Sequence, residues 1–154
     1  MNNYIAVAAT TNETAESWGG TSEFTDEAIT QLAMTAIGKP VLIDFDRGRE
    51  VGRVVSCKNA EGRLIVEFSV TEGAVIDKLL RLVPGYIVER DVFKENNRGI
   101  HRTINKAKST DYGLTYKPCE KDLPEIAKSK QAKTVHRMWE RTKTVHRLED
   151  ICQN

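Results

Sequence analysis

The feature that most constrains the fold of this chain is a series of short β-type segments separated by turns. The segments are rich in Val, Ile, Leu, Phe and Tyr, and glycine, asparagine or proline lies in most of the turns between them. We expect strands over residues 4–9, 40–46, 50–59, 63–70, 85–93 and 101–118. A chain that passes through many short, mainly antiparallel strands is typical of a closed or nearly closed β-barrel.

Residues 63–70 show the strand pattern most clearly. Leu64, Val66 and Phe68 alternate with more polar side chains, and only Ile65 departs from the alternation. Successive side chains of a strand point to opposite faces of its sheet, so this alternation indicates one buried face and one face in contact with solvent. We therefore expect a half-buried antiparallel strand here.

Three segments are predicted to be helical. Residues 25–38 begin with Thr25, a good N-cap, and their apolar stripe consists of Ala28, Ile29, Leu32, Ala33, Ala36 and Ile37. Residues 74–83 form a shorter amphipathic segment that ends before Pro84, and residues 123–152 are helical in pattern and basic. The predicted fold class is therefore α+β, mainly β: a closed or nearly closed antiparallel β-barrel with two inserted helices and a C-terminal helix.

The length of 154 residues favours one domain with its own core. The formal net charge of +1 is unevenly distributed along the chain. Residues 128–147 contain seven Lys or Arg and one Glu, whereas the remainder has five more acidic than basic residues. We therefore divide the chain into a β-barrel domain, residues 1–122, and a basic helical arm, residues 123–154.

Several classes of protein are excluded by what the sequence lacks. The three cysteines are far apart, with neither zinc-binding spacing nor a Cys-x-x-Cys pair, which favours reduced thiols in a cytosolic setting. The N-terminal residues lack a basic segment followed by a long apolar run, so we expect no signal peptide. There is no run of 18 apolar residues and no phosphate-binding glycine pattern. We expect no membrane contact, no cofactor and no metal.

Three segments resemble, in order, the motifs of the tailed-phage prohead (head-maturation) protease family, whose fold is similar to that of the herpesvirus assemblin proteases. The first is GKPVLIDFDRGREVGRVVSC, which resembles the family's G-x-P-V-L-x-x-H-D strand and the strand after it. The second is AVIDKLLRLVPGYIVERD, which resembles a helix leading to an S-x-G-[YF] strand. The third is INKAKSTDYGLTYKPCE, which resembles the final E-V-S-L-V-x-x-P-A strand. Together they cover residues 24–120, approximately.

The resemblance implies a serine-protease fold in which both catalytic positions are altered. Members of the family cleave scaffold and capsid-protein segments with a serine nucleophile and a histidine base. The alignment places Phe45 at the histidine position and Gly113 at the serine position. Asp46 matches the aspartate that follows the family's histidine, and Asp111 matches the acidic residue before its serine. Pro118 matches the proline that ends the family's last strand. A phenyl ring and a glycine cannot perform this chemistry, so we predict that the protein is a pseudo-protease and not an enzyme.

An active serine endopeptidase is the first alternative. Ser109 and His101 are the nearest replacements for the missing pair, and Ser56 or Ser69 would serve if the alignment were shifted. Ser109 lies four residues before Gly113, roughly 13 Å along a strand, which strains the geometry that catalysis requires. No histidine precedes residue 101, so none can lie on the strand over residues 40–46.

The resemblance also implies a place and a partner for a protein that binds without cleaving. We expect a non-enzymatic auxiliary or decoration protein of the phage head, present in the virion after assembly in the host cytoplasm. Its expected partner is the phage major capsid protein or another head protein.

The basic arm carries the predicted partner-binding residues. These are Lys133, Arg137, Trp139, Arg141, Lys143 and Arg147. A basic helix of this kind can be a solvated face, a contact to an acidic protein surface, or a contact to nucleic-acid phosphates. Nucleic-acid binding through residues 128–147 is therefore the second alternative function.

Overall fold

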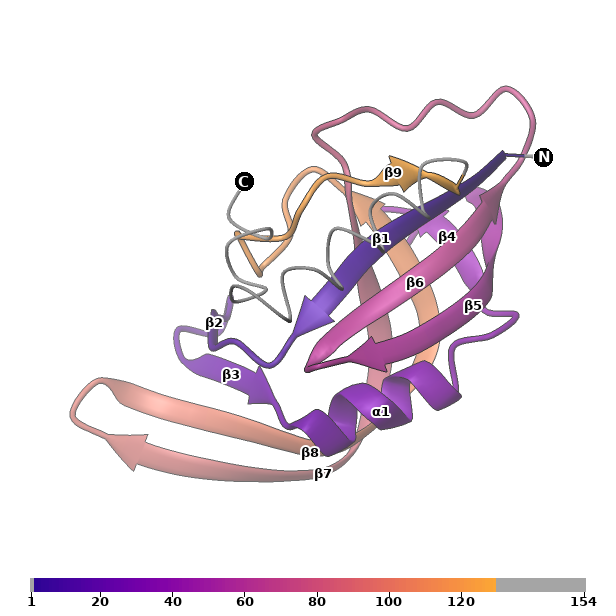
Figure 1. The fold of residues 1–154 in the computed structure, drawn as a ribbon. Coiled ribbons are helices and arrows are strands. Elements are labelled where there is room, and N and C mark those ends of the chain that lie inside the picture. The colour runs from indigo at the N-terminus through magenta and orange to yellow at the C-terminus, as the bar shows by residue number, and fades with distance from the viewer. Residues whose placement is uncertain (1, 130–154) are drawn as a thin grey trace, which may run out of the picture.

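The computed structural model describes residues 2–129, which form one α-helix and nine strands (Figure 1). In chain order these are β1 (Asn2–Thr10), β2 (Thr14–Ala15), β3 (Thr21–Phe24), α1 (Asp26–Met34), β4 (Pro40–Ile43), β5 (Glu50–Ala60), β6 (Arg63–Val70), β7 (Arg81–Asn96), β8 (Gly99–Thr115) and β9 (Ala127–Lys128). The mainly-β prediction is confirmed, and β1, β5 and β6 begin and end within two residues of the segments expected from the sequence.

The strands belong to one strongly curled sheet that stays open, so the predicted closed barrel is wrong (Figure 1). The strand order is β2-β3-β8-β4-β5-β6-β1-β9, and β7 pairs with the other edge of β8. β1 and β7 approach each other across the open side. Within residues 2–129 no strand pairing joins them. Pro84 in β7 has no backbone N–H to donate, which suits an unpaired edge.

The sheet is also mixed rather than purely antiparallel. β8 runs parallel to β3, where Thr21 pairs with His101, and parallel to β4, where Leu42 pairs with Gly113. The other long pairings, β1 with β6, β5 with β6 and β7 with β8, are antiparallel. β3 and β4 therefore run in the same direction along one edge of β8, and the helix α1 lies in the connection between them.

Helix α1 covers one side of the sheet and completes the main core. The Thr25 hydroxyl accepts a hydrogen bond from the Ala28 N–H at 3.1 Å, which confirms the predicted N-cap. The helix packs against β8, β5 and β6. Its side chains Ala28, Ile29 and Leu32 are fully buried in one cluster with Phe68. Burial of this apolar face, rather than helix propensity, stabilises so short a helix.

The end of α1 differs from the prediction. The helix ends at Met34, and Thr35 is its C-cap. Ile37 lies three residues beyond the helix and is 66% exposed, so its assignment to the buried stripe is wrong. Ala36 is buried as expected, although it lies in the turn after the helix.

The predicted helix over residues 74–83 is absent, because strand pairing replaces it. Residues 71–80 are turns and extended chain, and β7 begins at Arg81. Leu80 and Leu82 are buried, whereas Arg81 between them is partly exposed. This two-residue period follows from pairing with β8, where Leu82 lies opposite Leu114. The tertiary partner therefore overrides a local helical pattern.

The described beginning of the predicted C-terminal helix is extended. Ala127 and Lys128 form β9, which pairs with Ile5 and Tyr4 of β1, so the sheet extends beyond residue 122. Leu123 packs with Val7 and Ile65 in a second, smaller apolar cluster. Ile65 departs from the alternation of β6 because this cluster covers the second face of the strand.

Strands β7 and β8 form a long hairpin that extends beyond the body of the sheet (Figure 1). Phe93, on this hairpin, is half exposed and contacts Trp18 edge-on at a centroid distance of 6.4 Å. The Arg102 guanidinium lies 5.3 Å from the centre of the Phe93 ring and donates to Asp91 at 2.7 Å. The strands expected over residues 85–93 and 101–118 are both present. One continuous hairpin, β7 with β8, contains most of their residues.

Gly52 allows β5 to pack closely beside β6. A Cβ atom at this position would overlap the carbonyl oxygen of Ser69 in the neighbouring strand. We predict that Gly52→Ala lowers the free energy of unfolding by roughly 1–3 kcal/mol, because a backbone carbonyl cannot move without disturbing the strand pairing. Urea unfolding followed by circular dichroism measures this. Gly48→Ala is the control, since its Cβ would lie at an ordinary 3.4 Å from Asp46 Oδ1. Equal stability of the two variants would contradict the prediction.

Candidate functional site

A tight turn follows β4 and places Phe45 at the open side of the curled sheet. Asp44 and Phe45 both have left-handed backbone conformations, with φ values of 48° and 60°. The Asp46 N–H donates to the Ile43 carbonyl at 2.9 Å, and the Asp44 N–H donates to the Leu114 carbonyl at 3.0 Å. Two successive positive φ angles suit Gly, Asn or Asp, and a bulky residue adopts them at a cost of about 1–3 kcal/mol. The predicted strand over residues 40–46 therefore ends at residue 43.

The ring of Phe45 lies directly against the backbone of Gly113. A Cβ atom on Gly113 would lie 2.5 Å from the Cε2 atom of the ring and 2.7 Å from Cζ. Gly85 of β7 also lies near this ring, and its Cβ would lie 3.0 Å from Cε1. The structure thus brings together Phe45 and Gly113, which the family alignment placed at the histidine and serine positions.

A cavity of about 410 Å³ adjoins the Phe45 ring, at the open side of the half-barrel. Its lining residues are Ala8, Ala9, Asn12, Thr14, Glu16, Ser22, Glu23, Phe24, Asp44, Phe45, Val83, Pro84, Tyr86, Thr115, Lys117, Pro118, Cys119 and Glu120. The Phe24 and Tyr86 rings meet edge to face at a centroid distance of 5.1 Å. Burial and the nearby charge of Glu16 raise the pKa of the Tyr86 hydroxyl. We call this cavity the open-end pocket.

Glu120 connects the open-end pocket to the edge of β1. Its carboxylate accepts from the Thr10 N–H at 3.1 Å and from the Thr10 hydroxyl at 2.5 Å. Burial nevertheless raises the pKa of this carboxyl group above its ordinary value, since the hydrogen bonds from Thr10 offset the loss of hydration only in part. A carboxylate held in this way fixes the chain after β8 across the open side of the sheet.

Ser109 lies beneath helix α1 and not at the open-end pocket. It is 4% exposed, and its hydroxyl donates to the Leu32 carbonyl at 2.9 Å. The Tyr112 hydroxyl lies 2.8 Å from Ser109 Oγ, and the thiol of Cys57 contacts the same hydroxyl. Burial raises the pKa of Cys57 to about 12 and also raises that of Tyr112. This buried polar chain joins the helix to the sheet, and its groups are kept in their neutral forms.

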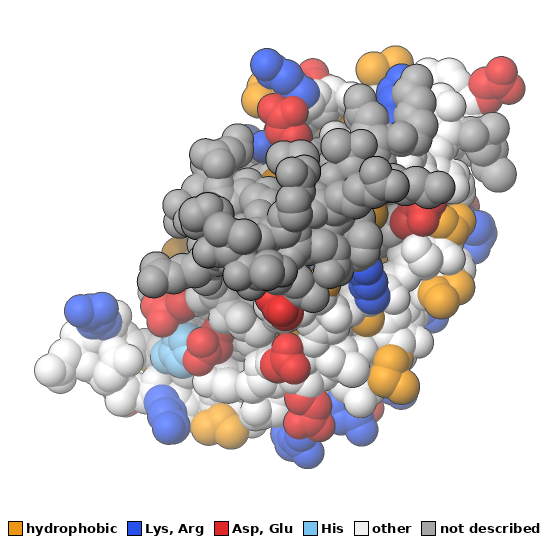
Figure 2. All heavy atoms as spheres, viewed as in Figure 1, with side chains coloured by type: hydrophobic (Ala, Val, Ile, Leu, Met, Phe, Trp, Pro, Cys, Tyr) orange, Lys and Arg blue, Asp and Glu red, His pale blue; other side chains and the backbone are white. Residues whose placement is uncertain are grey.

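His101 lies far from Ser109, near the distal end of the hairpin. The Thr21 hydroxyl is 2.7 Å from its Nδ1 atom, and Glu23 Oε1 is 3.1 Å from Nε2. Acidic side chains gather around the one histidine visible in Figure 2. Ser109 follows eight residues later on the same continuous strand, roughly 26 Å away along β8. The structure does not bring these two rescue candidates together. Ser56 and Ser69 also lie on strands without a neighbouring histidine within residues 2–129.

The six partner-binding residues predicted in the arm, from Lys133 to Arg147, lie outside the described residues. Among residues 2–129, no group of three or more His, Cys, Asp or Glu side chains is arranged to hold a metal ion. In the same part of the chain, no helix has both the length and the apolar character needed to cross a bilayer.

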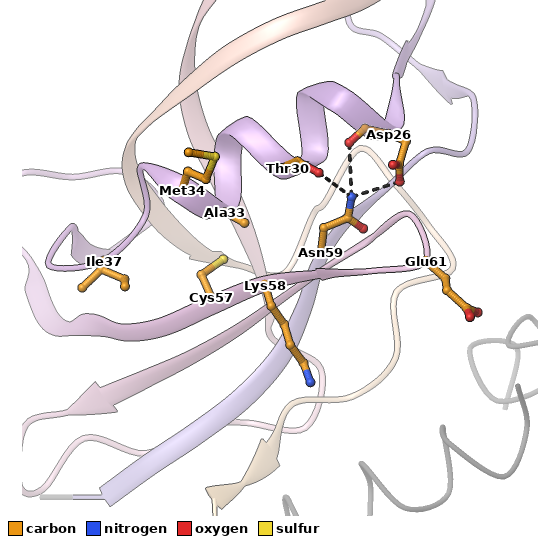
Figure 3. Close-up of a pocket in the computed structure, with 9 residues that line it drawn as sticks. All are labelled: Asp26, Thr30, Ala33, Met34, Ile37, Cys57, Lys58, Asn59 and Glu61. Atoms are coloured by element: carbon orange, nitrogen blue, oxygen red, sulfur yellow. Dashed lines mark hydrogen bonds between the residues drawn. The ribbon is translucent and has the colours of Figure 1, made fainter.

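A second, wider hollow lies between α1 and β5 (Figure 3). Asn59 spans it, because its Nδ2 atom donates to Asp26 Oδ1 at 2.9 Å and to Thr30 Oγ1 at 2.9 Å. Cys57 points toward the helix, whereas Lys58 points away from it (Figure 3). These hydrogen bonds secure the N-terminal half of α1 on the sheet, so Asn59, Asp26 and Thr30 have a structural role.

Sequence reasoning found Phe45 but missed most of the open-end pocket. Phe24, Tyr86 and Glu120 lie far apart in the chain, and the sequence analysis singled out none of them as a site residue, although Tyr86 and Glu120 fall within the quoted segments. The sequence showed an excess of acidic residues outside the arm, but it did not indicate that four of them would line one pocket. The location of the pocket depends on the parallel pairing of β8 with β3 and β4, which no local pattern indicates.

The contact between Phe45 and Gly113 can be tested by a double-mutant cycle. We predict that Gly113→Ala lowers the free energy of unfolding by roughly 1–3 kcal/mol, because its Cβ overlaps the ring. In a Phe45→Gly background the same change costs much less, since the ring is gone and glycine suits the positive φ. Urea unfolding of the wild type, both single variants and the double variant gives the coupling. Additive effects would show that the two residues do not touch.

Glu120 is expected to make stability depend on pH. A carboxyl group with a raised pKa in the folded state favours the folded protein while it is protonated. That contribution is complete below the ordinary pKa of 4.5 and is lost as the pH rises through the folded-state pKa. We predict that Glu120→Gln removes this fall in unfolding free energy, whereas Glu125→Gln, at an exposed position, does not. Urea unfolding of the three proteins between pH 4 and 7 checks this, and parallel profiles would contradict it.

Comparisons with known proteins found no matching family model, no similar curated protein and no similar solved structure.

Proposed function

We propose that the protein is a non-enzymatic bacteriophage head protein, an auxiliary or decoration protein with a degenerate prohead-protease fold, that binds the major capsid protein. The observation that carries the proposal is the contact of Phe45 with Gly113. The family alignment assigns these positions to a histidine and a serine, two residues that a serine protease must hold together. The positions come from segments almost seventy residues apart, so their contact supports the alignment.

The Phe45 ring occupies the space that a side chain at position 113 would need. Phe45 is 38% exposed, its ring lies against Gly113 and Gly85, and it lines the open-end pocket. A strained backbone at a bulky residue is found most often where function requires it. In the proposed function the ring supplies an apolar binding surface in place of a catalytic group, so that a peptide segment of the partner is bound and not cleaved.

The alternatives have less support from the described residues. A serine endopeptidase needs an accessible hydroxyl beside a base, but Ser109 is buried and hydrogen-bonded to a helix carbonyl. His101 lies far away on the hairpin. Nucleic-acid binding was assigned to residues 128–147, and all but the first two of these lie outside the described part of the chain.

Co-purification with the major capsid protein encoded by the same phage tests the proposal. We predict that tagged protein, co-expressed with that capsid protein, retains it on an affinity column and leaves its length unchanged. A serine-directed fluorophosphonate probe should label no residue. Phe45→Gly should reduce retention, whereas Val75→Ala, at a position 84% exposed and remote from the pocket lining, should not. Cleavage of the capsid protein with labelling of a serine, or no retention by the wild type, would overturn the proposal.

A further inference from the structure

The charged side chains of the open-end pocket do not select a charged ligand. Three of its four carboxylates are already hydrogen-bonded within the protein: Glu16 with Ser22, Glu23 with His101, and Glu120 with Thr10. The fourth carboxylate, that of Asp44, is exposed, and so is the one lining amine, that of Lys117. These two charges are opposite in sign. A charged ligand would therefore lose hydration in the cavity while one of the two groups repelled it.

The rest of the lining is largely apolar, and three aromatic rings belong to it. Phe24, Phe45 and Tyr86 supply these rings. The other apolar lining residues are Ala8, Ala9, Val83, Pro84, Pro118 and Cys119. The volume of about 410 Å³ lies within the range of roughly 300–1,000 Å³ that is usual for ligand pockets. Aromatic rings attract one another in edge-to-face and offset arrangements beyond the gain from burial alone, so this lining favours an aromatic ligand.

The aromatic walls are held in place before a ligand binds. The Phe24 and Tyr86 rings are in edge-to-face contact, with a centroid distance of 5.1 Å. The Phe45 ring lies against the backbone of Gly113 and near Gly85. Side chains that are already fixed lose little conformational entropy on binding, so the pocket is preorganised for a flat group.

The Tyr86 hydroxyl gives the pocket a hydrogen-bond donor. Within residues 2–129 this hydroxyl has no hydrogen-bond partner, and no side-chain polar atom there is both buried and unpaired, so the hydroxyl is accessible. Glu16 and Cys119, which act electrostatically on it, also line the pocket. Burial and the charge of Glu16 raise the pKa of Tyr86. The hydroxyl therefore stays protonated at neutral pH and can donate to an acceptor atom of a ligand.

We propose that the open-end pocket binds one uncharged aromatic group with a hydrogen-bond acceptor, the side chain of a tyrosine in the partner's bound segment. The inference rests on the proposed function, in which this pocket holds a segment of the partner, and it specifies which side chain enters. Among the uncharged aromatic side chains, that of phenylalanine has no polar atom and that of tryptophan only donates, whereas the tyrosine oxygen accepts. A free phenol has the same chemistry, so the experiments separate these two sources.

Titration of the ¹⁵N-labelled full-length protein with p-cresol, the tyrosine side chain as a free molecule, tests the inference. We expect saturable shifts of the amide signals of Phe45, Tyr86 and Cys119. Three compounds serve for comparison: 4-methylcyclohexanol lacks the aromatic ring, 4-hydroxyphenylacetate is an anion, and tyramine is a cation. We expect each of them to bind at least about threefold more weakly than p-cresol. Equal or tighter binding of any of the three would overturn the inference.

Variants test the role of the Tyr86 hydroxyl. Tyr86→Phe should weaken the binding of p-cresol by about threefold to tenfold, the size of one neutral hydrogen bond. Tyr116→Phe is the matched control, at an exposed position outside the pocket lining, and should leave the affinity unchanged. Toluene, which has no acceptor, should bind equally to the wild type and to Tyr86→Phe, which excludes a change in pocket shape. Equal affinity of p-cresol for the wild type and for Tyr86→Phe would contradict the inference.

The two proposals fail in distinguishable ways. If the co-expressed capsid protein is retained and p-cresol does not bind, the inference is wrong and the proposed function stands. If p-cresol binds as expected and no capsid protein is retained, the proposed function is wrong. Release of retained capsid protein by p-cresol, with weaker retention by Tyr86→Phe, supports both. If p-cresol binds but does not release the capsid protein, the partner's tyrosine is ruled out as the occupant, and the pocket takes a free phenol.

Discussion

Strand β8 is the element on which the rest of the structure depends. β7 pairs with it from end to end, whereas β3 and β4 share its other edge, and α1 packs against it. A strand whose two edges are both paired fixes the positions of all its neighbours. Its 17 residues carry His101 near one end, Ser109 in the middle and Gly113 near the other end. The fold therefore separates the rescue candidates and brings Gly113 to Phe45.

The turn after β4 shows how a local cost is offset by tertiary contacts. Asp44 and Phe45 adopt left-handed conformations that bulky side chains avoid. Backbone hydrogen bonds to Ile43 and Leu114 hold the turn, and the ring packs on the backbone of Gly113, which has no side chain. These surrounding contacts together hold the strained backbone in place. It places an aromatic surface at the wall of a pocket that acidic residues also line.

The parts of the fold that could be predicted are those governed by neighbours in the chain. The N-cap at Thr25 and the strand over residues 63–70 depend on spacing within a few residues, and both are present. The helix predicted over residues 74–83 and the closed barrel are absent. Both failures have the same cause, because a local pattern does not include the long-range pairing that decides whether a segment becomes a strand or which edges meet.

The amino-acid sequence by itself determined that the protein is mainly β, that Thr25 caps the start of its first helix, and that no histidine precedes residue 101. These properties follow from residue type and short-range spacing. Only the tertiary structure decided that the sheet stays open and that Phe45 covers Gly113. It also gathered Glu16, Asp44 and Glu120 around one pocket. The reason is physical: these groups lie tens of residues apart, and the pairing of β3 and β4 with β8, together with the hydrogen bonds from Thr10 to Glu120, brings their segments together.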